Sequence, residues 1–414
     1  MSTSTAISFD NTEYAFEYKK NSDLENAHFL FSLIGKPWLV NLALKLTPWA
    51  IKWNLPFVKL VLRKTIFQQF VGGQNLQETA GVVNTLNSHN VQVILDYGVE
   101  GGDDGEQAFD YAAEEFIKVI DYAAKQSNIP FMSIKVTGLS RFGLLEKLDT
   151  LMNHSGGSFM NSYSKAIELL NDEEKKEWKK VKNRLHAICE RASKNKVGVL
   201  IDAEETWIQD PVDALTLKMM DLYNRESIVV YNTLQLYRID RLKFLKDCHE
   251  AAVEKGFILG VKLVRGAYME NERKRAAQLN YPSPIQLNKE NCDRDFNDAI
   301  EFSISNINKI SVIVASHNEQ SNLYSTQLLA KNGLSCNHPH VHFSQLYGMS
   351  DNITFNLAKA GFSVSKYLPF GPIKDVVPYL MRRAQENSSV SGQMGRELGL
   401  LKKEINRRKR FQKF

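Results

Sequence analysis

Eight short apolar stretches recur along the chain, and longer segments with the apolar periodicity of helices separate them. The stretches begin at Val91, Phe131, Val197, Ile228, Phe257, Ile310, Val341 and Phe362. Apolar, β-branched runs that alternate with helices are typical of a parallel sheet. Eight of them in succession predict an α/β fold, specifically a (β/α)8 barrel of the TIM type rather than an open sheet.

Polar residues follow these stretches, at the points where the predicted strands end. They are Asp96, Lys135, Asp202, Glu204, Asn232, Gln235, Arg265, His317, Asn318, Gln345 and Tyr367. The carboxyl ends of all strands in such a barrel meet at one mouth, and functional groups gather there in this fold. We therefore expect the functional residues at the barrel mouth.

The barrel pattern divides the chain into three regions. An N-terminal helical region that is partly amphipathic covers residues 1–75, the barrel covers 76–395, and a basic C-terminal tail covers 396–414. Within residues 29–70, prolines and lysines interrupt the apolar sequence, and no apolar run reaches the ~18 residues that a membrane-spanning helix needs. Short amphipathic helices are expected there, with apolar faces that lie on a membrane surface or pack against the rest of the protein.

Positive charge is concentrated at the two ends of the chain. The 414 residues include 52 Lys and Arg and 47 Asp and Glu, which gives a formal net charge of +5. Residues 26–77 hold six basic and no acidic residues, residues 402–414 hold seven basic and one acidic, and the remainder carries −7. Basic ends indicate either contact with an anionic surface, such as lipid headgroups or nucleic acid, or solvated helix faces.

The cysteines and the first residues bear on the compartment. The four cysteines, at positions 189, 248, 292 and 336, show no CxxC spacing, which indicates reduced thiols in a reducing compartment. The opening sequence MSTSTAISFDNTEY has neither a cationic start nor an apolar segment. We therefore expect neither a secretory signal nor a transit peptide.

The segment after the eighth stretch, GPIKDVVPYLMRRAQENSS, predicts a helix that caps the barrel mouth. Asp375 is its expected N-cap, with Pro378 in the first turn. The spacing places on one face Tyr379, Arg382, Arg383 and Glu386. Adjacent arginines beside a tyrosine predict a carboxylate clamp or a surface salt-bridge face. Together with the lysines and arginine that follow other strands, they favour a site for an anionic substrate, a phosphate, or both.

Several motifs, in this order and spacing, resemble the proline dehydrogenase family. They are MSIK, VLIDAEE, VYNTLQLY, VKLVRGAYME, ASHNE, FSQLYGM, YLPFGP and YLMRRAQENSS. The resemblance covers roughly residues 70–395. It implies an FAD-dependent (β/α)8 barrel that oxidises L-proline to Δ1-pyrroline-5-carboxylate and passes the electrons to a quinone. It also explains the absence of a strand–GxGxxG–helix unit, since the glycine-rich residues 101–105 contain repelling aspartates and indicate a loop.

The resemblance implies a role for each matching residue. Arg382, Arg383 and Lys135 would bind the proline carboxylate, and Leu346, Tyr367 and Tyr379 would wall the ring pocket. Asp202 would position Lys135, Lys262 would lie near the flavin ring, and both would act in catalysis. Glu100 would gate the site by pairing with the helix arginines. The FAD contacts would be Ala203, Asn232, Arg265, Gly266, Ala267, His317 and Asn318.

One feature differs from the bacterial bifunctional members of the family. These commonly have Arg where this chain has Lys262 and Lys where it has Arg265, whereas the order found here resembles eukaryotic-type enzymes. Both positions keep their charge, but the bidentate geometry of Arg moves from one position to the other.

The partners implied by the resemblance are L-proline, a quinone acceptor and a separate pyrroline-5-carboxylate dehydrogenase downstream, since no second catalytic domain follows. With the basic ends, this predicts a cytoplasmic protein held peripherally on the inner face of the energy-conserving membrane, without a nucleic-acid partner. Hydroxyproline dehydrogenase is the nearest alternative, although an aromatic Tyr367 would crowd a ring hydroxyl. The spacing of Cys336, His338, His340 and His342 also leaves open a metal-dependent barrel hydrolase, and the NRRKRFQK tail a nucleic-acid-binding protein.

Overall fold

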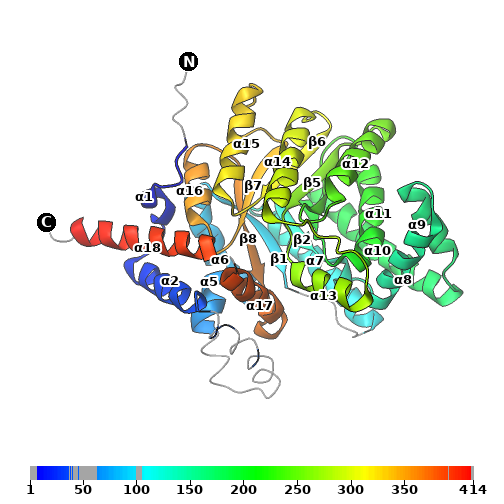
Figure 1. The fold of residues 1–414 in the computed structure, drawn as a ribbon, viewed down its shortest axis with the longest axis horizontal. Coiled ribbons are helices and arrows are strands. Elements are labelled where there is room, and N and C mark those ends of the chain that lie inside the picture. The colour runs from blue at the N-terminus through cyan, green and yellow to red at the C-terminus, as the bar shows by residue number, and fades with distance from the viewer. Residues whose placement is uncertain are drawn as a thin grey trace. The chain divides into compact units, whose positions relative to one another are not determined.

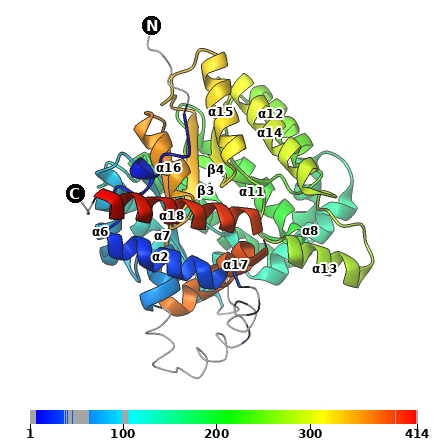
Figure 2. The same ribbon diagram turned by 60° about the vertical axis from the view of Figure 1, so that its left-hand side comes forward.

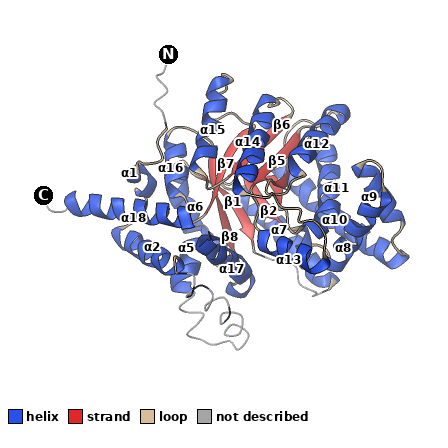
Figure 3. Cartoon of the chain, viewed as in Figure 1, coloured by secondary structure: helices blue, strands red, loops and turns tan. Residues whose placement is uncertain are grey.

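Eight parallel strands close into a barrel in which neighbouring strands follow chain order. The strands, red in Figure 3, are β1 (Gln92–Tyr97), β2 (Phe131–Ile134), β3 (Gly198–Ile201), β4 (Val230–Gln235), β5 (Leu259–Val264), β6 (Ile310–Ala315), β7 (Val341–Leu346) and β8 (Val364–Phe370). Each lies within one of the eight apolar stretches, so the predicted (β/α)8 fold is confirmed. The computed structural model describes residues 7–36, 38, 40, 45, 63–98, 105–389 and 391–411, with the backbone alone at 64, 384–389 and 391–394.

Alternate residues of each strand face the barrel interior and the surrounding helices. In β4 the Tyr231 ring packs edge-on against Phe131 of β2, and its hydroxyl bonds to Ser311 of β6, so Tyr231 faces inward. The next residue, Asn232, donates from Nδ2 to Asp213 Oδ1 at 2.9 Å. Asp213 belongs to helix α11 (Thr206–Tyr223), so Asn232 faces outward. This two-residue period decides which strand residues can reach the barrel interior.

The chain divides into two compact units. The central unit comprises residues 99–316 and 320–342 and holds β2 to β6. The terminal unit comprises the residues up to 98, residues 317–319 and the residues from 343 onward, and it holds β1, β8 and most of β7. The terminal unit is therefore built from the two ends of the chain.

Helices surround the strands of the central unit. They are α7 (Glu106–Ala123), the 3-10 helix η2 (Val136–Gly138), α8 (Phe142–Ser155), α9 (Phe159–Glu168), α10 (Asp172–Asn195), α11, α12 (Arg241–Lys255), α13 (Met269–Leu279), α14 (Lys289–Ser305) and α15 (Glu319–Lys331). A capping box begins the long helix α10, since Asn171 Oδ1 accepts from Glu174 N and the Glu174 carboxylate accepts from Asn171 N. Trp178 and Leu185 lie on its buried face, while its lysines face outward.

The terminal unit adds helices from both ends of the chain. They are α1 (Thr12–Phe16), α2 (Asn21–Ile34), the π-helical turn η1 (Arg63–Phe67), α5 (Gln68–Phe70), α6 (Leu76–Asn87), α16 (Asp351–Lys359), α17 (Ile373–Ser389) and α18 (Ser391–Phe411). Figures 1 and 2 show α2 and α18 running side by side. The apolar face of α2 is therefore packed within the protein.

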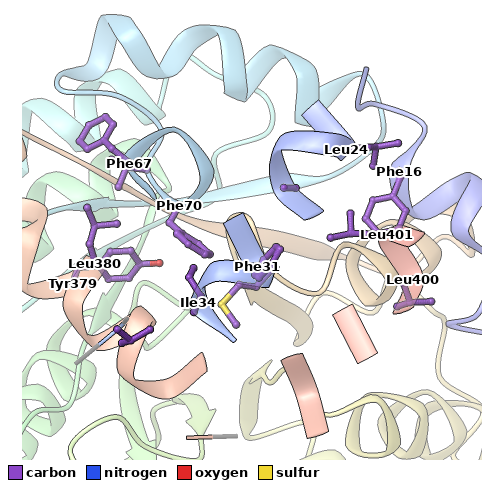
Figure 4. Close-up of a cluster of buried hydrophobic side chains, with 14 of the residues drawn as sticks. Phe16, Leu24, Phe31, Ile34, Phe67, Phe70, Tyr379, Leu380, Leu400 and Leu401 are labelled. Atoms are coloured by element: carbon purple, nitrogen blue, oxygen red, sulfur yellow. The ribbon is translucent and has the colours of Figure 1, made fainter. Parts of the chain in front are cut away.

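One hydrophobic cluster joins these terminal helices (Figure 4). It includes Phe16, Leu24, Phe31, Ile34, Phe67, Phe70, Tyr379, Leu380, Leu400 and Leu401. Helix α17, which carries the adjacent arginines, thus packs against α2 and η1 from the N-terminal region. The tryptophans and prolines at positions 48–56, expected on amphipathic helices, lie outside the described residues.

The expected basic tail forms an ordered helix instead. Residues 396–411 belong to α18, because Leu400 and Leu401 form part of an apolar stripe that packs on α2. Many of its cations have acidic or carbonyl partners. Arg407 and Arg408 both bond to the buried Glu404, and Arg408 also donates to the carbonyl oxygens of residues 16 and 19, each at 2.7 Å. Much of the C-terminal positive charge is therefore used to attach α18 to the N-terminal helices.

No helix in the described part of the chain combines the length and the apolar character that crossing a bilayer requires.

Candidate active site

Two lysines and an aspartate meet near the carboxyl ends of strands in the central unit. Lys135 directly follows β2, Asp202 directly follows β3, and Lys262 lies in β5. Lys262 Nζ donates to Asp202 Oδ1, and Lys135 Nζ lies 3.5 Å from Asp202 Oδ2. The backbone N–H of Asp202 donates to the carbonyl oxygen of Ile134, which ties the loop after β3 to β2. The structure thus brings together three of the predicted site residues.

The cluster is buried and carries net positive charge. The three side chains are between 5% and 11% exposed. Burial alone would raise the pKa of Asp202, but the charges of Lys262 and Lys135 outweigh it and hold that pKa well below its ordinary value. Asp202 is therefore anionic at neutral pH, beside two lysines. A buried group of this kind favours a bound anion and disfavours a bound cation.

Two polar residues at or after the ends of β2 and β4, Thr137 and Gln235, received no individual role from the family motifs, although Gln235 was expected at the barrel mouth. Thr137 Oγ1 donates to the buried Glu204 carboxylate at 2.9 Å. Gln235, the last residue of β4, donates from Nε2 to the Glu204 carbonyl oxygen at 2.7 Å and accepts at Oε1 from Ala267 N at 3.3 Å. Gln235 lies on the same inward face of β4 as Tyr231. The two-residue period of the strand is the signal that distinguishes it from Asn232.

The RGAY segment after β5 approaches a buried tyrosine closely. Gly266 has φ +144°, and an added Cβ would overlap the ring of Tyr237. Glycine is needed there because any side chain would be strained and would also collide with that ring. Gly266 and Ala267 therefore present bare backbone beside Gln235.

Arg265 is held rigidly at the start of the same segment. Its Nε donates to Asp293 at 2.7 Å, its Nη1 to Ser316 at 2.7 Å and its Nη2 to Ser321 at 3.0 Å. Its guanidinium carbon lies 4.3 Å from the centroid of the Phe296 ring. A guanidinium has five N–H donors, and these three bonds leave donors for a bound anion.

Asn232 does not join these residues, contrary to expectation. Its side chain faces outward and bonds to Asp213 of α11, as described above. Asn232 and Gln235 occupy opposite faces of β4, and only Gln235 is directed inward, so this orientation does not support the predicted cofactor contact of Asn232. Ala203 lies in the loop that follows Asp202 and is buried.

The terminal unit holds the other predicted substrate residues. Leu346 of β7 pairs in register with Tyr367 of β8, and it packs against the same cluster that contains Tyr379. The guanidinium carbon of Arg383 lies 5.1 Å from the centroid of the Tyr379 ring. Arg383 is 7% exposed and Arg382 is half-buried. The two guanidinium groups give this part of α17 positive charge, which favours an anion.

Helix α17 begins earlier than the sequence predicted. The backbone N–H groups of Asp375 and Val376 both donate to the carbonyl oxygen of Pro372, so the helix has already begun at Ile373. The expected N-cap role of Asp375 is therefore wrong, although a carboxylate in the first turn still suits the helix dipole. Pro378 lies inside the helix on an exposed face, where its ring does not disturb packing.

His317 and Asn318 follow β6 and belong to the terminal unit. His317 is half-buried, and its Nδ1 lies 2.9 Å from Oγ of the buried Ser350. Glu100, the predicted gate, lies outside the described residues, as does the side chain of Glu386.

The histidines near β7 do not form a metal site. Three of the candidate ligands precede the strand, namely Cys336, His338 and His340. His342 packs edge-on against Phe131, and burial lowers its pKa to about 3. Throughout the described ranges, no group of His, Cys, Asp and Glu residues is arranged to hold a metal ion.

The sequence of this chain is similar to that of known proteins. Residues 80–396 match the proline dehydrogenase family. The chain is 33% identical to proline dehydrogenase 1, mitochondrial, of Dictyostelium discoideum, over 84% of this chain and 65% of that protein. It is 33% identical to the carbapenem antibiotics biosynthesis protein CarD of Pectobacterium carotovorum, over 82% of this chain and 83% of that protein. It is 32% identical to hydroxyproline dehydrogenase of Xenopus laevis, over 84% of this chain and 78% of that protein.

Solved structures share the fold. Proline utilization A (PutA) from Bdellovibrio bacteriovorus superposes with a TM-score of 0.68 at 19% identity, over 94% of this chain and 40% of that chain. The chain thus spans about two thirds of the Dictyostelium relative and less than half of the PutA chain.

Proposed function

Because the chain belongs to the proline dehydrogenase family, we propose that it oxidises L-proline to Δ1-pyrroline-5-carboxylate with FAD as cofactor. The observation that carries the proposal is the buried cluster of Lys135, Asp202 and Lys262 near the ends of barrel strands. A buried, net positive cluster suits a small carboxylate substrate that reacts as a neutral amine. The carboxyl ends of strands are also where barrel enzymes carry their active sites.

We assign the carboxylate of proline to Arg382, Arg383 and Lys135, as the family motifs imply. The near-complete burial of Arg383 supports this assignment, because charge-assisted, bidentate hydrogen bonds to a carboxylate are strongest where water is excluded. Leu346, Tyr367 and Tyr379 would wall the ring, and the shared packing of Leu346 and Tyr379 supports that role.

The chain selects the reactive form of proline electrostatically. Proline reacts as the neutral amine, whose lone pair forms the C5=N bond as hydride leaves C5. The ammonium groups of Lys135 and Lys262 disfavour a protonated amine beside them, since like charges repel. Asp202 anchors both ammonium groups and so keeps them in place.

FAD, when bound, would supply the hydride acceptor and pass the electrons to a quinone. The donor set fits such a group, since Arg265 keeps N–H donors for a phosphate and Gly266 leaves backbone bare beside Gln235. We assign the cofactor to Lys262, Arg265, Gly266, Ala267, Ala203, His317 and Asn318. Asn232 is left out, because its amide bonds to Asp213. Glu100 keeps its proposed role as a gate.

We further propose peripheral attachment to the inner face of an energy-conserving membrane, where a quinone is at hand, and a separate downstream pyrroline-5-carboxylate dehydrogenase. Exposed apolar side chains in the N-terminal region support attachment. Phe29 is 62% and Trp38 is 65% exposed, and Lys36 between them is exposed as well. An amphipathic face with a nearby cation is suited to the boundary of an anionic bilayer.

Anaerobic titration of the FAD-loaded protein with L-proline tests the proposed activity. Proline should bleach the visible flavin band, and the product should react as a cyclic imine. A flavin band that stays unchanged at saturating proline would contradict the proposal.

Hydroxyproline is the second candidate substrate, because the Xenopus relative is named hydroxyproline dehydrogenase. The bulk of Tyr367 argues for proline, since it would crowd a ring hydroxyl if it lines the ring pocket. Comparing kcat/KM for L-proline and hydroxyproline decides between them, and a higher value for hydroxyproline would reverse the order.

A further inference from the structure

Lys366 is a fully buried lysine that the proposed chemistry does not use. It lies in β8, and its side chain is 0% exposed. Its neighbour Tyr367 faces the barrel interior, so Lys366 faces outward, toward α16. Burial of an ammonium group lowers the stability of the fold unless hydrogen-bond acceptors or an opposite charge compensate it.

The partners of Lys366 lie in the segment that runs from the last residue of β7, Leu346, through a turn to the first residue of α16, Asp351. Its Nζ lies 2.8 Å from Asp351 Oδ1, donates to the carbonyl oxygen of Met349 at 2.5 Å and lies 3.5 Å from that of Leu346. The ammonium group thus has one ion pair and two carbonyl acceptors around it. The turn closes on itself, since Met349 N donates to the Leu346 carbonyl oxygen at 3.2 Å. Lys366 therefore holds both ends of this tight turn.

The turn leaves little freedom at its other positions. Gly348 has φ +79°, and an added Cβ would overlap the backbone oxygen of Gln69. Gln69 Nε2 also donates to the Gly348 carbonyl oxygen at 2.7 Å. Ser350 adopts a left-handed conformation and bonds to His317. The turn is thus held from α5, from the segment after β6 and, through Lys366, from β8.

Asp351 balances the charge of Lys366 without any exposure to solvent. Tyr18 donates to Asp351 Oδ2 at 2.8 Å, and Lys19 Nζ lies 3.3 Å from the same oxygen. Asp351 also begins α16, where the helix dipole favours a carboxylate. Glu397 of α18 faces the same group of charges and is buried. The ion pair between Lys366 and Asp351 is therefore buried and belongs to a network that also includes Tyr18 and Lys19.

The turn begins at a residue proposed to wall the substrate pocket. Leu346 lies opposite Tyr367 in the β7–β8 register, and Tyr347 N donates to the Tyr367 carbonyl oxygen at 2.9 Å. In this arrangement Tyr367 would face the ring pocket. The Nζ of its neighbour Lys366 lies 3.5 Å from the carbonyl oxygen of Leu346, the pocket residue opposite Tyr367.

We propose that Lys366 is a positioning residue, which fixes Leu346 against Tyr367 and so sets the ring pocket for substrate. The inference rests on the proposed function, since it concerns the same pocket. Leu346 and Tyr367 would contact the ring both before and during reaction, so their displacement weakens substrate binding more than it slows turnover.

The test uses the full-length, FAD-loaded protein and the variant Lys366→Met, which keeps the length of the side chain but loses its donors. We expect the KM for L-proline to rise on the order of tenfold or more, with kcat changed much less. The Kd of a proline-sized ring carboxylate that cannot be oxidised, measured by calorimetry, should rise by a similar factor.

A second variant keeps the test valid if the lone substitution leaves Asp351 uncompensated and unfolds the protein. Replacement of both partners, Lys366→Met with Asp351→Leu, removes a buried ion pair in favour of apolar contacts, which proteins often tolerate. The double variant still lacks the donors to the turn, so it should show the same rise in KM.

Gln345→Leu is the matched control. Gln345 pairs with Lys366 in the β7–β8 register, is equally buried and faces outward, where Thr354 Oγ1 donates to it at 2.8 Å. If Lys366 had a purely structural role, the single variant, the double variant and Gln345→Leu would all have the same KM for L-proline. This result would overturn the inference. A wild-type protein that proline does not reduce would instead overturn the proposed function.

Discussion

At the scale of single residues, Arg383 combines deep burial with a direct contact to a predicted pocket residue. It lies over Tyr379 on the same face of α17, and a carboxylate bound there would form charge-assisted hydrogen bonds. Each such bond contributes about 1.5–3 kcal/mol when shielded from water.

We expect Arg383→Met to raise the KM for proline between about 10-fold and 100-fold and to leave FAD content largely unchanged, because Arg383 is assigned to the substrate carboxylate and not to the cofactor. Steady-state kinetics with the flavin-to-protein ratio measures both quantities. Lys374→Met, at an exposed position of the same helix, is the control. A KM that matches this control would remove Arg383 from the carboxylate site.

Gly266 offers a test of the RGAY segment. Gly266→Ala should lower stability by about 1–3 kcal/mol and reduce FAD content, because its Cβ would collide with the Tyr237 ring. Thermal unfolding and flavin absorbance measure these effects. Gly156→Ala separates the two causes, because Gly156 also has positive φ but open space around it. Equal losses in both variants would mean that backbone strain, rather than the collision, is responsible.

Asp149 makes stability depend on pH. Burial, together with the nearby charge of Asp210, raises its pKa from 3.8 to about 8. Between these values the folded protein holds a proton that the unfolded chain has released, so stability falls as pH rises, by up to about 1.4 kcal/mol per pH unit.

We expect Asp149→Asn to raise the unfolding temperature at pH 8 but to change it little at pH 4, because asparagine keeps an oxygen for the N–H of Asp210. Unfolding curves across this range test the sign, with exposed Asp298→Asn as the control. Equal shifts at both pH values would contradict the assigned protonation.

At the scale of elements, the strands were predictable and the ends of the chain were not. Apolar β-branched runs identified all eight strands, because burial on both faces leaves a continuous apolar signal. The predicted start of α17 was too late. Asp375, three residues before Pro378, resembles an N-cap, but the helix begins at Ile373. Residues 396–411 looked like a tail because their charges obscure a short apolar stripe.

The candidate site was only partly predictable for a related reason. The ion pairs of Lys135 and Lys262 with Asp202 join strand ends that are far apart in sequence, and the family motifs identified these residues. Asn232 and Gln235 both precede the next helix, and only the observed pleat shows which one faces inward. The role of Lys366 depends on carbonyl groups, whose positions no side-chain pattern reveals.

Arg408 provides the test for the attachment of α18. It donates to the carbonyl oxygens of Phe16, the last residue of α1, and of Lys19 beyond it, and also to the side chains of Asn21 and Glu404. We expect Arg408→Ala to speed amide hydrogen exchange in α1 and α18 by roughly 10-fold or more, since hydrogen bonds to charged groups contribute about 1.5–3 kcal/mol. Lys402→Ala, at an exposed position of the same helix, should leave exchange unchanged. Equal exchange in both variants would show that apolar packing alone holds α18.

At the scale of the whole molecule, the two basic ends differ in what they offer a partner. Cations of α18 pair with Asp10, Glu13, Glu25 and Glu404, or with nearby carbonyl groups. The N-terminal region instead exposes Phe29 and Trp38. Attachment to an anionic membrane is therefore expected to depend on the N-terminal side chains more than on the C-terminal charges.

Replacing Phe29 and Trp38 by Ser should weaken binding to vesicles of mixed anionic and neutral phospholipid by on the order of tenfold or more, because each side chain would lose about 2 kcal/mol of apolar burial. Sedimentation with the vesicles measures the bound fraction. Leu287→Ser, at a position 87% exposed in the central unit, is the control. An equal effect of the control would exclude a specific N-terminal contact.

The assembly of the terminal unit from both ends of the chain has a consequence for synthesis. Residues 99–342 lie between its two main segments. At about 5–20 residues per second, the ribosome needs on the order of 12–50 s to make them. Throughout that interval Phe16, Phe31 and Phe70 lack the α17 and α18 side chains that later cover them. We therefore expect chaperones to bind the nascent N-terminal segment. The central unit can fold before the terminal unit starts to fold.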